Sequence, residues 1–275
     1  METILLPTDF SSTAANAGLY AIEFAKQVGA SKIVLYHAYQ APVNIGTDAI
    51  MPVNLLDIDT LKEAAEIGAK GFKERLEPHA SGIKLETMTE FNLLVSGIDE
   101  VCETVKADII IMGITGGGAI EEKFIGSNAI SIAKHTSVPV IVVPPESTFS
   151  SIREILLVSD YKEVEKTTPI DQIKKILIST KAKLFVLHVT NSNESNTAAP
   201  EGSVLHSLLK EFNPQFKFID SPNFTETIND YATEIKADLI ITIPKKHGLF
   251  DAIFKRSHTK MLAFHSHVPL MVVHT

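Results

Sequence analysis

Short apolar runs alternate, in the first half of the chain, with longer segments in which apolar residues recur every third or fourth position. Apolar runs of about four to eight residues bounded by turn residues are typical of buried strands, and the wider spacing is typical of amphipathic helices. The predicted strands are residues 3–7, 32–39, 84–90, 108–113 and 138–144. The predicted helices are residues 11–30, 60–80, 97–107 and 127–135.

The same pattern returns in the second half of the chain. The segment "ILLPTDFSS" at 4–12 reappears as "ILLVSDYKE" at 155–163, and "ADIIIMGITGGG" at 107–118 reappears as "ADLIITIPKKHG" at 237–248. The turn-rich, polar segment "PPESTFSS", residues 144–151, separates the two copies and reads as a linker. A repeat on this scale indicates two copies of one structural unit.

Alternating helices and nearly all-apolar strands predict a parallel sheet covered by helices on both faces. The fold class is therefore α/β. We expect two tandem doubly wound, Rossmann-like domains, each a mainly parallel five-stranded sheet. Their predicted bounds are residues 1–145 and 152–275.

Composition narrows the classes of function. The formal net charge of −8 argues against a nucleic-acid partner, because non-specific binding to nucleic acid depends on a basic surface. The chain has no apolar run of membrane-spanning length and no signal-peptide pattern at its start, so we expect a cytoplasmic protein without a membrane partner. The single cysteine, Cys102, cannot form an internal disulfide and is expected to be an inert packing residue.

A glycine-rich segment, "MGITGGGAIEEKFIGSNAISIAKH", follows the apolar strand at 108–113 and leads into a predicted helix at Ser127. Closely spaced backbone N–H groups and the positive end of a helix form a binding site for anions such as phosphates. In a doubly wound sheet, ligands bind at the carboxyl ends of the strands where the strand order reverses. If the first and fourth strands are neighbours there, Asp9 and Gly113 lie at the same site.

The spacing Gly113-x2-Gly116-x9-Gly126-Ser127 resembles that of the universal stress proteins of the ATP-binding type. The segments "LLPTDFS", "VLYHAY" and "VPVIVV" extend the resemblance, which covers the whole chain as two tandem family domains. It implies a Rossmann-like stress-response or regulatory module that binds ATP, with Mg²⁺. The residues implied at the nucleotide are Pro7, Thr8, Asp9, Ala38, Met112, Gly113, Ile114, Thr115, Gly116, Gly126, Ser127 and Asn128.

The resemblance also implies roles for these residues. Asp9 would lie by the ribose and phosphates and help to hold the metal ion, and the backbone of Ala38 would meet adenine. Met112 and Gly113 would border the base and ribose. The phosphates would be held by Gly116, Gly126, Ser127 and Asn128.

Three of the side chains near this site also have structural interpretations. Asp9 is a candidate N-cap of the first helix, and this role can coexist with ligand binding. Ser127 can cap the fourth helix or offer its hydroxyl to a phosphate. We interpret His37 as a hydrogen-bonded strand residue rather than as a ligand or base.

The second copy departs from the glycine pattern. Ile243, Lys246 and Arg256 stand where the first copy has glycines, whereas Ser257 and Asp160 match Ser127 and Asp9. We expect a degenerate site and a structural role for this domain, with binding of another anion by the basic side chains left open. Its histidines, His247, His258, His265, His267 and His274, match no standard zinc spacing and are expected to be ordinary surface or packing residues.

Two alternatives to a nucleotide-binding module remain: a slow ATP hydrolase on the same scaffold, and a nucleotide-independent interaction protein. The segment "PTDFSS" lacks the serine- and glycine-rich phosphate loop of ATP-pyrophosphatase-like ligases, which argues against ligase chemistry. The resemblance further implies that the domains pair through "VPVIVV" and "VPLMVV", and a homodimer is a further candidate assembly.

Overall fold

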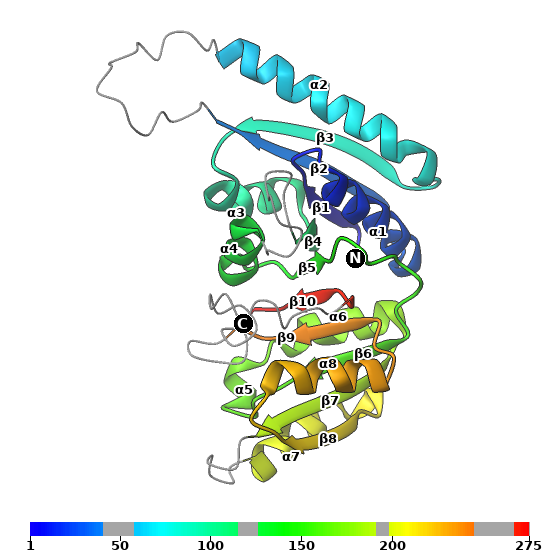
Figure 1. The fold of residues 1–275 in the computed structure, drawn as a ribbon, viewed down its shortest axis with the longest axis vertical. Coiled ribbons are helices and arrows are strands. Elements are labelled where there is room, and N and C mark those ends of the chain that lie inside the picture. Colours follow the sequence, from blue (N-terminus) through cyan, green and yellow to red (C-terminus); the bar gives the residue numbers. More distant parts are fainter. Residues whose placement is uncertain (41–57, 115–125, 191–197, 245–266, 275) are drawn as a thin grey trace, which may run out of the picture.

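The computed structural model describes residues 1–40, 58–114, 126–190, 198–244 and 267–274 (Figure 1). The strands are β1 (Thr3–Pro7), β2 (Lys32–Tyr39), β3 (Lys84–Phe91), β4 (Ile109–Gly113), β5 (Val140–Val143), β6 (Glu154–Val158), β7 (Lys183–Thr190), β8 (Gln215–Asp220), β9 (Leu239–Thr242) and β10 (Leu270–Val272). The α-helices are α1 (Ser12–Val28), α2 (Ile58–Leu76), α3 (Leu94–Val105), α4 (Ser127–His135), α5 (Val164–Thr167), α6 (Ile170–Thr180), α7 (Ala198–Leu209) and α8 (Phe224–Glu234). Two short 3₁₀ turns, η2 (Glu77–His79) and η3 (Lys210–Phe212), follow α2 and α7.

The described strands form one sheet in the order β3-β2-β1-β4-β5-β10-β9-β6-β7-β8. All neighbouring strands are parallel except β5 and β10, which pair antiparallel with Ile141 opposite Met271. The strand order on either side of this pair is the same when read outwards, so the two halves of the sheet have matching strand orders in Figure 1. This arrangement confirms the predicted α/β class with a mainly parallel sheet.

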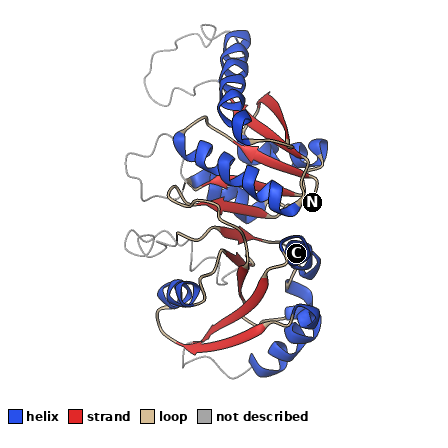
Figure 2. Cartoon of the chain, turned by 90° about the vertical axis from the view of Figure 1, so that its right-hand side faces the viewer, coloured by secondary structure: helices blue, strands red, loops and turns tan. Residues whose placement is uncertain are grey.

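Helices cover the sheet on both faces (Figure 2). Buried side chains of α1, α2, α6 and α7 form one core cluster with one face, and those of α3, α4 and α8 form the other cluster with the opposite face. Alternate residues of β1 serve the two clusters, since Ile4 and Leu6 belong to the first and Leu5 to the second. All three are fully buried, as expected for a central strand of a two-sided sheet.

The strand order reverses between β1 and β4. The chain runs from β1 outwards through β2 and β3 and then returns to the other side of β1, where Ile4 and Leu5 pair with Ile109 and Ile110. The first and fourth strands are therefore neighbours, which is the condition under which Asp9 and Gly113 lie at the same site. Because loops at such a point diverge to opposite faces of the sheet, they leave a crevice at the carboxyl ends of the strands.

Side chains of α1 hold the segment between β5 and β6. Asn16 donates from Nδ2 to the carbonyl oxygens of Pro144 (3.3 Å) and Ser147 (3.0 Å). Gln27 exchanges two hydrogen bonds with the backbone of Ile152, at 2.8 and 2.9 Å. The linker thus runs along α1. No helix in the described ranges is both long and apolar enough to cross a membrane.

Candidate functional site

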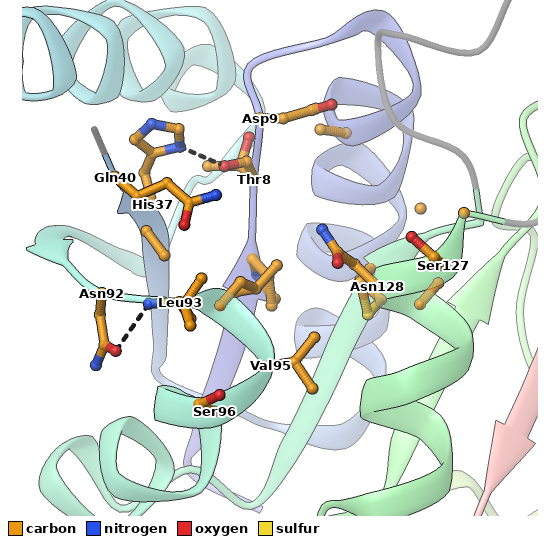
Figure 3. A pocket seen from close by; sticks show the side chains of 18 of the residues that line it. Thr8, Asp9, His37, Gln40, Asn92, Leu93, Val95, Ser96, Ser127 and Asn128 are labelled. Carbon is orange, nitrogen blue, oxygen red and sulfur yellow. Dashed lines mark hydrogen bonds between the residues drawn. The ribbon is translucent and has the colours of Figure 1, made fainter. Parts of the chain in front are cut away.

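A cavity of 560 Å³ opens at the carboxyl ends of β1, β2 and β4, beside the N-termini of α3 and α4 (Figure 3). This volume falls within the range of about 300–1,000 Å³ that is usual for small-molecule sites. Its described lining comprises Pro7, Thr8, Asp9, Ala14, His37, Ala38, Gln40, Asn92, Leu93, Leu94, Val95, Ser96, Met112, Gly113, Ile114, Gly126, Ser127, Asn128 and Ala129.

Ten of the residues expected at a nucleotide meet at this one cavity. They are Pro7, Thr8, Asp9, Ala38, Met112, Gly113, Ile114, Gly126, Ser127 and Asn128. The other two, Thr115 and Gly116, lie outside the described residues. Segments up to 121 positions apart in the sequence therefore face one space, because β1, β2 and β4 are neighbours in the sheet.

The turn after β1 is fixed by its own side chains. Thr8 accepts the N–H of Phe10 (2.9 Å), and Asp9 accepts the N–H of Ser11 (3.1 Å). Phe10 has a left-handed backbone with φ of 67°, which turns the chain before the helix starts. The N-cap of α1 is Ser11, which accepts the N–H of Ala14 (3.2 Å).

The expectation that Asp9 caps α1 is therefore wrong. The left-handed turn at Phe10 places the first helical residue one position beyond Ser11, out of the capping range of Asp9. Asp9 instead holds the turn that precedes the cap. Its exposed carboxylate lines the cavity.

His37 is held as a structural residue, as predicted from the sequence. Its Nδ1 donates to the carbonyl oxygen of Thr8 (2.8 Å), and its ring packs on Phe10 with centroids 4.3 Å apart. Phe10 in turn occupies the space over Gly68 of α2, where an added Cβ would lie 2.5 Å from the phenyl ring. These contacts hold the turn after β1 against β2 and α2 at the edge of the cavity.

Gly113 and Gly126 have different local requirements. A Cβ on Gly113 would lie 2.8 Å from Cγ2 and 3.1 Å from the carbonyl oxygen of Thr13, so close packing of β4 against α1 requires glycine there. Gly126 has φ of −60° and ψ of 138°, a conformation open to every residue type. Its own backbone therefore does not explain the choice of glycine.

Gly126 is also the N-cap of α4, and no side chain caps this helix in the described structure. Ser127, expected as a candidate cap, is instead the first helical residue, and its exposed side chain faces the cavity with that of Asn128. The first N–H groups of a helix have no partner within the helix and carry the positive end of its dipole. The α4 end of the cavity is therefore suited to an anion.

The segment from the end of β3 into the first turn of α3 also lines the cavity and was not expected from the sequence. Asn92, Leu93 and Ser96 lie across the cavity from Ser127 and Asn128 in Figure 3, and Val95 also lines it. Asn92 accepts the N–H of Leu93 (2.8 Å) and lies over Gly97, whose missing Cβ would come within 2.3 Å of its amide nitrogen. The available signal was Asn92 itself, a polar residue at the carboxyl end of the third strand, the end of a doubly wound sheet at which ligands bind.

The electrostatic character of the lining is simple. Asp9 and His37 are its ionisable side chains among the described residues, and it contains no lysine or arginine there. In β2, burial and the nearby Glu90 carboxylate raise the pKa of Tyr36, which precedes His37, so that this phenol stays neutral. An anionic ligand would meet backbone and polar donors, and it would need a cation to offset Asp9.

The second half repeats the β1 turn at the end of β6. His188 donates from Nδ1 to the carbonyl oxygen of Ser159 (2.8 Å) and packs on Tyr161 with ring centroids 4.6 Å apart. The next helix is divided into α5 and α6, whereas α1 is continuous. This change accompanies buried Ile243 in place of Gly113.

Several second-half positions named in the sequence analysis fall outside the described residues: Lys246, Arg256, Ser257, His247, His258 and His265. His267 is exposed, and its Nδ1 lies 3.5 Å from Oε2 of Glu146. His274 forms a hydrogen bond through Nε2 to the carbonyl oxygen of Ala133 (3.0 Å). In the parts of the chain that the structure describes, no group of three or more His, Cys, Asp or Glu side chains could hold a metal ion.

Comparisons with known proteins find similarity to universal stress proteins. The model of the universal stress protein family matches residues 1–144. A universal stress protein of Methanocaldococcus jannaschii is 32% identical over 142 residues, which are 52% of this chain and 81% of that protein.

Solved structures match over nearly the whole chain. A universal stress protein from Archaeoglobus fulgidus superposes with a TM-score of 0.69 at 20% identity, covering 99% of this chain and 96% of that one. A putative universal stress protein from Pseudomonas aeruginosa gives a TM-score of 0.59 at 15% identity, covering 99% and 93%. At these identities the likeness concerns the fold.

Proposed function

Because the chain belongs to the universal stress protein family, we propose that its first half is an ATP-binding regulatory or stress-response module. The nucleotide site is the cavity at the ends of β1, β2 and β4. Binding of ATP changes the shape or the partners of the module, which is its output.

One observation carries this proposal. The ten described residues expected at a nucleotide come from three strand ends and one helix start, and all of them line the same 560 Å³ cavity. Packing roles alone would not require these ten residues to line one cavity. The agreement supports a ligand of nucleotide size with an anionic end.

The two ends of the cavity differ in chemistry, which suggests how ATP lies in it. Ala38 and Met112 supply apolar surface at the β2 and β4 ends, suited to the base and ribose. Gly126, Ser127 and Asn128 surround the start of α4, where backbone N–H groups, the Ser127 hydroxyl and the Asn128 amide suit phosphates.

The residues present also fit a bound Mg²⁺. This ion is commonly held by one or two carboxylates together with phosphate oxygens, and Asp9 supplies a carboxylate at the cavity. The described lining has no lysine or arginine to neutralise a triphosphate, so the metal ion would offset the charge. Asp9 is the residue that we assign to it.

We also propose that residues 152–275 form a second domain of the same kind that serves as a structural partner. The antiparallel pairing of β5 with β10 supports this role, because it joins the two half-sheets and covers both edge strands. Buried Ile243 in place of Gly113 supports a site that no longer takes a nucleotide in the same way.

Mass spectrometry of the released ligand tests the proposal. The full chain, purified without added nucleotide, is denatured and the supernatant is analysed beside that of a folded Gly126→Val variant. We expect ATP or ADP from the wild type and at least tenfold less from the variant. If the wild type releases no nucleotide and also fails to bind added Mg·ATP, the proposed function is wrong.

A further inference from the structure

Two aspartates do the same work at matching places in the two halves. Asp108 accepts the backbone N–H groups of Glu2 (2.6 Å) and Thr3 (3.1 Å) on Oδ2, at the start of β1. Asp238, 130 positions later, accepts those of Arg153 (2.8 Å) and Glu154 (3.0 Å) on Oδ2, at the start of β6. In each case the second carboxylate oxygen remains for another partner.

That second partner differs between the halves. Oδ1 of Asp108 forms an ion pair with the ammonium group of Lys175, which α6 supplies from the other half. Lys175 lies six residues before the C-cap of α6, and the residue six positions before the C-cap of α1 is Glu23. Glu23 is an acid and pairs with Lys26 (2.7 Å). No lysine, arginine or histidine in the described ranges forms an ion pair with Asp238.

A cavity of 120 Å³ lies beside Asp238. We call it the linker cavity, and its walls include Tyr20 of α1, Asp238, and Ser147, Ser150 and Ser151 of the linker. It shares no lining residue with the cavity at the ends of β1, β2 and β4. Its volume has room for several water-sized groups.

Tyr20 brings a polar atom without a partner to this cavity. Its side chain is 3% exposed, and its hydroxyl has no hydrogen-bond partner in the described structure. The ring is fixed edge-on against Phe149 with centroids 4.9 Å apart. Burial, and then the negative charge of Asp238, raise the pKa of Tyr20, so the phenol is neutral and within electrostatic range of that carboxylate.

A buried hydroxyl without a hydrogen-bond partner, such as that of Tyr20, is costly. The Asp238 carboxylate lines the same cavity, and the matching carboxylate of the first half, Asp108, is paired with the ammonium group of Lys175. A single group that donates N–H bonds and carries positive charge satisfies both. We propose that the linker cavity binds a small primary ammonium ion, such as ammonium or methylammonium. Its N–H groups are accepted by the free carboxylate oxygen of Asp238 and by the hydroxyl of Tyr20.

The bound ion would pair with the carboxylate of Asp238 as the ammonium group of Lys175 pairs with that of Asp108. Both arrangements join a helix of one half to a strand start of the other, since Tyr20 belongs to α1 and Asp238 precedes β9. Occupancy therefore strengthens the contact between the halves. This inference is independent of nucleotide binding at the first cavity.

Thermal unfolding of the full chain tests the proposal. Ammonium chloride or methylammonium chloride is exchanged for tetramethylammonium chloride at constant ionic strength, because the tetramethylated ion has no N–H group to donate. We expect Tm to rise with ammonium by about 2–5 °C and to saturate. The rise should vanish in Asp238→Asn and fall to less than half in Tyr20→Phe.

Asp108→Asn is the matched control, because it removes the same capping carboxylate where Lys175 already supplies the cation. It should lower Tm and keep the full response to ammonium. If Asp238→Asn does not fold, Tyr20→Phe decides, since it removes only the hydroxyl. An equal response in wild type and Tyr20→Phe, no difference between ammonium and tetramethylammonium, or an equal response to sodium would each overturn the proposal.

Discussion

Replacing Gly126 by valine tests whether this glycine is required for ligand binding or for folding. The backbone at Gly126 has φ of −60° and ψ of 138°, which valine adopts readily. A poor N-cap residue costs up to about 1 kcal/mol, and the loss of unfolded-state entropy returns about 0.4–1 kcal/mol. We therefore expect the free energy of unfolding to change by less than about 1 kcal/mol.

The same substitution should remove nucleotide binding. Valine places a branched side chain at the start of α4, on the wall assigned to the phosphates. Losing two charge-assisted hydrogen bonds to phosphate costs about 3–6 kcal/mol, since each contributes about 1.5–3 kcal/mol. The affinity for Mg·ATP should then fall more than about 100-fold. Isothermal titration calorimetry and urea unfolding of the same preparation measure the two effects.

Gly113→Ala is the contrasting variant. Its new Cβ would lie 2.8 Å from the Thr13 side chain and 3.1 Å from the Thr13 carbonyl oxygen, and overpacking of this kind costs about 1–3 kcal/mol. It should therefore lower stability. Gly71→Ala, at an exposed position of α2 with no atom within 4 Å of the new methyl, is the matched control and should leave binding unchanged. Unchanged affinity in folded Gly126→Val, or a stability loss as large as that of Gly113→Ala, would refute the reasoning.

Three further predictions follow from single side chains. Asp9→Asn keeps the acceptor for the N–H of Ser11 but loses the metal-binding charge. The gain in ATP affinity that Mg²⁺ causes should therefore be at least fivefold smaller in this variant than in the wild type, as measured by calorimetry with and without Mg²⁺. Burial raises the pKa of Asp108, but bonds from Glu2 and Lys175 outweigh it and leave that pKa lowered. Its stabilisation is thus fully present above its unfolded pKa of about 3.9 and is lost as the pH falls from there through the lowered folded pKa, and Asp108→Asn should flatten the acid limb of a urea-unfolding series. Burial raises the pKa of Cys102 to about 12, so iodoacetamide should label it only after unfolding.

The sequence predicts most of the first half because its signals are local. The helix at 127–135 was predicted with its observed bounds, since glycine precedes it and its apolar residues keep helical spacing. The α/β class with a mainly parallel sheet followed from the alternation of helices with nearly all-apolar strands. Ten expected site residues met at one cavity because each stands at a strand end or helix start, where position in the sequence fixes position in the sheet.

What the sequence did not predict depends on geometry beyond the local pattern. Asp9 was expected as the cap of α1, and the observed cap at Ser11 rests on the left-handed backbone of Phe10, an uncommon conformation for that residue type. The wall at Asn92 was missed because no glycine marks it. The linker cavity depends on Tyr20 and Asp238, which are distant in sequence and meet only where the two halves pack.

The stoichiometry of Mg·ATP binding tests the central claim most directly. Calorimetric titration of the full wild-type chain counts the sites, and the same titration of Gly126→Val identifies which site is counted. We predict one ATP per chain in the wild type and none in the variant. Two ATP per chain, with the second site lost on mutating Lys246 or Arg256, would contradict the division between a nucleotide-binding first half and a structural second half. No binding to the wild type would contradict the account as a whole.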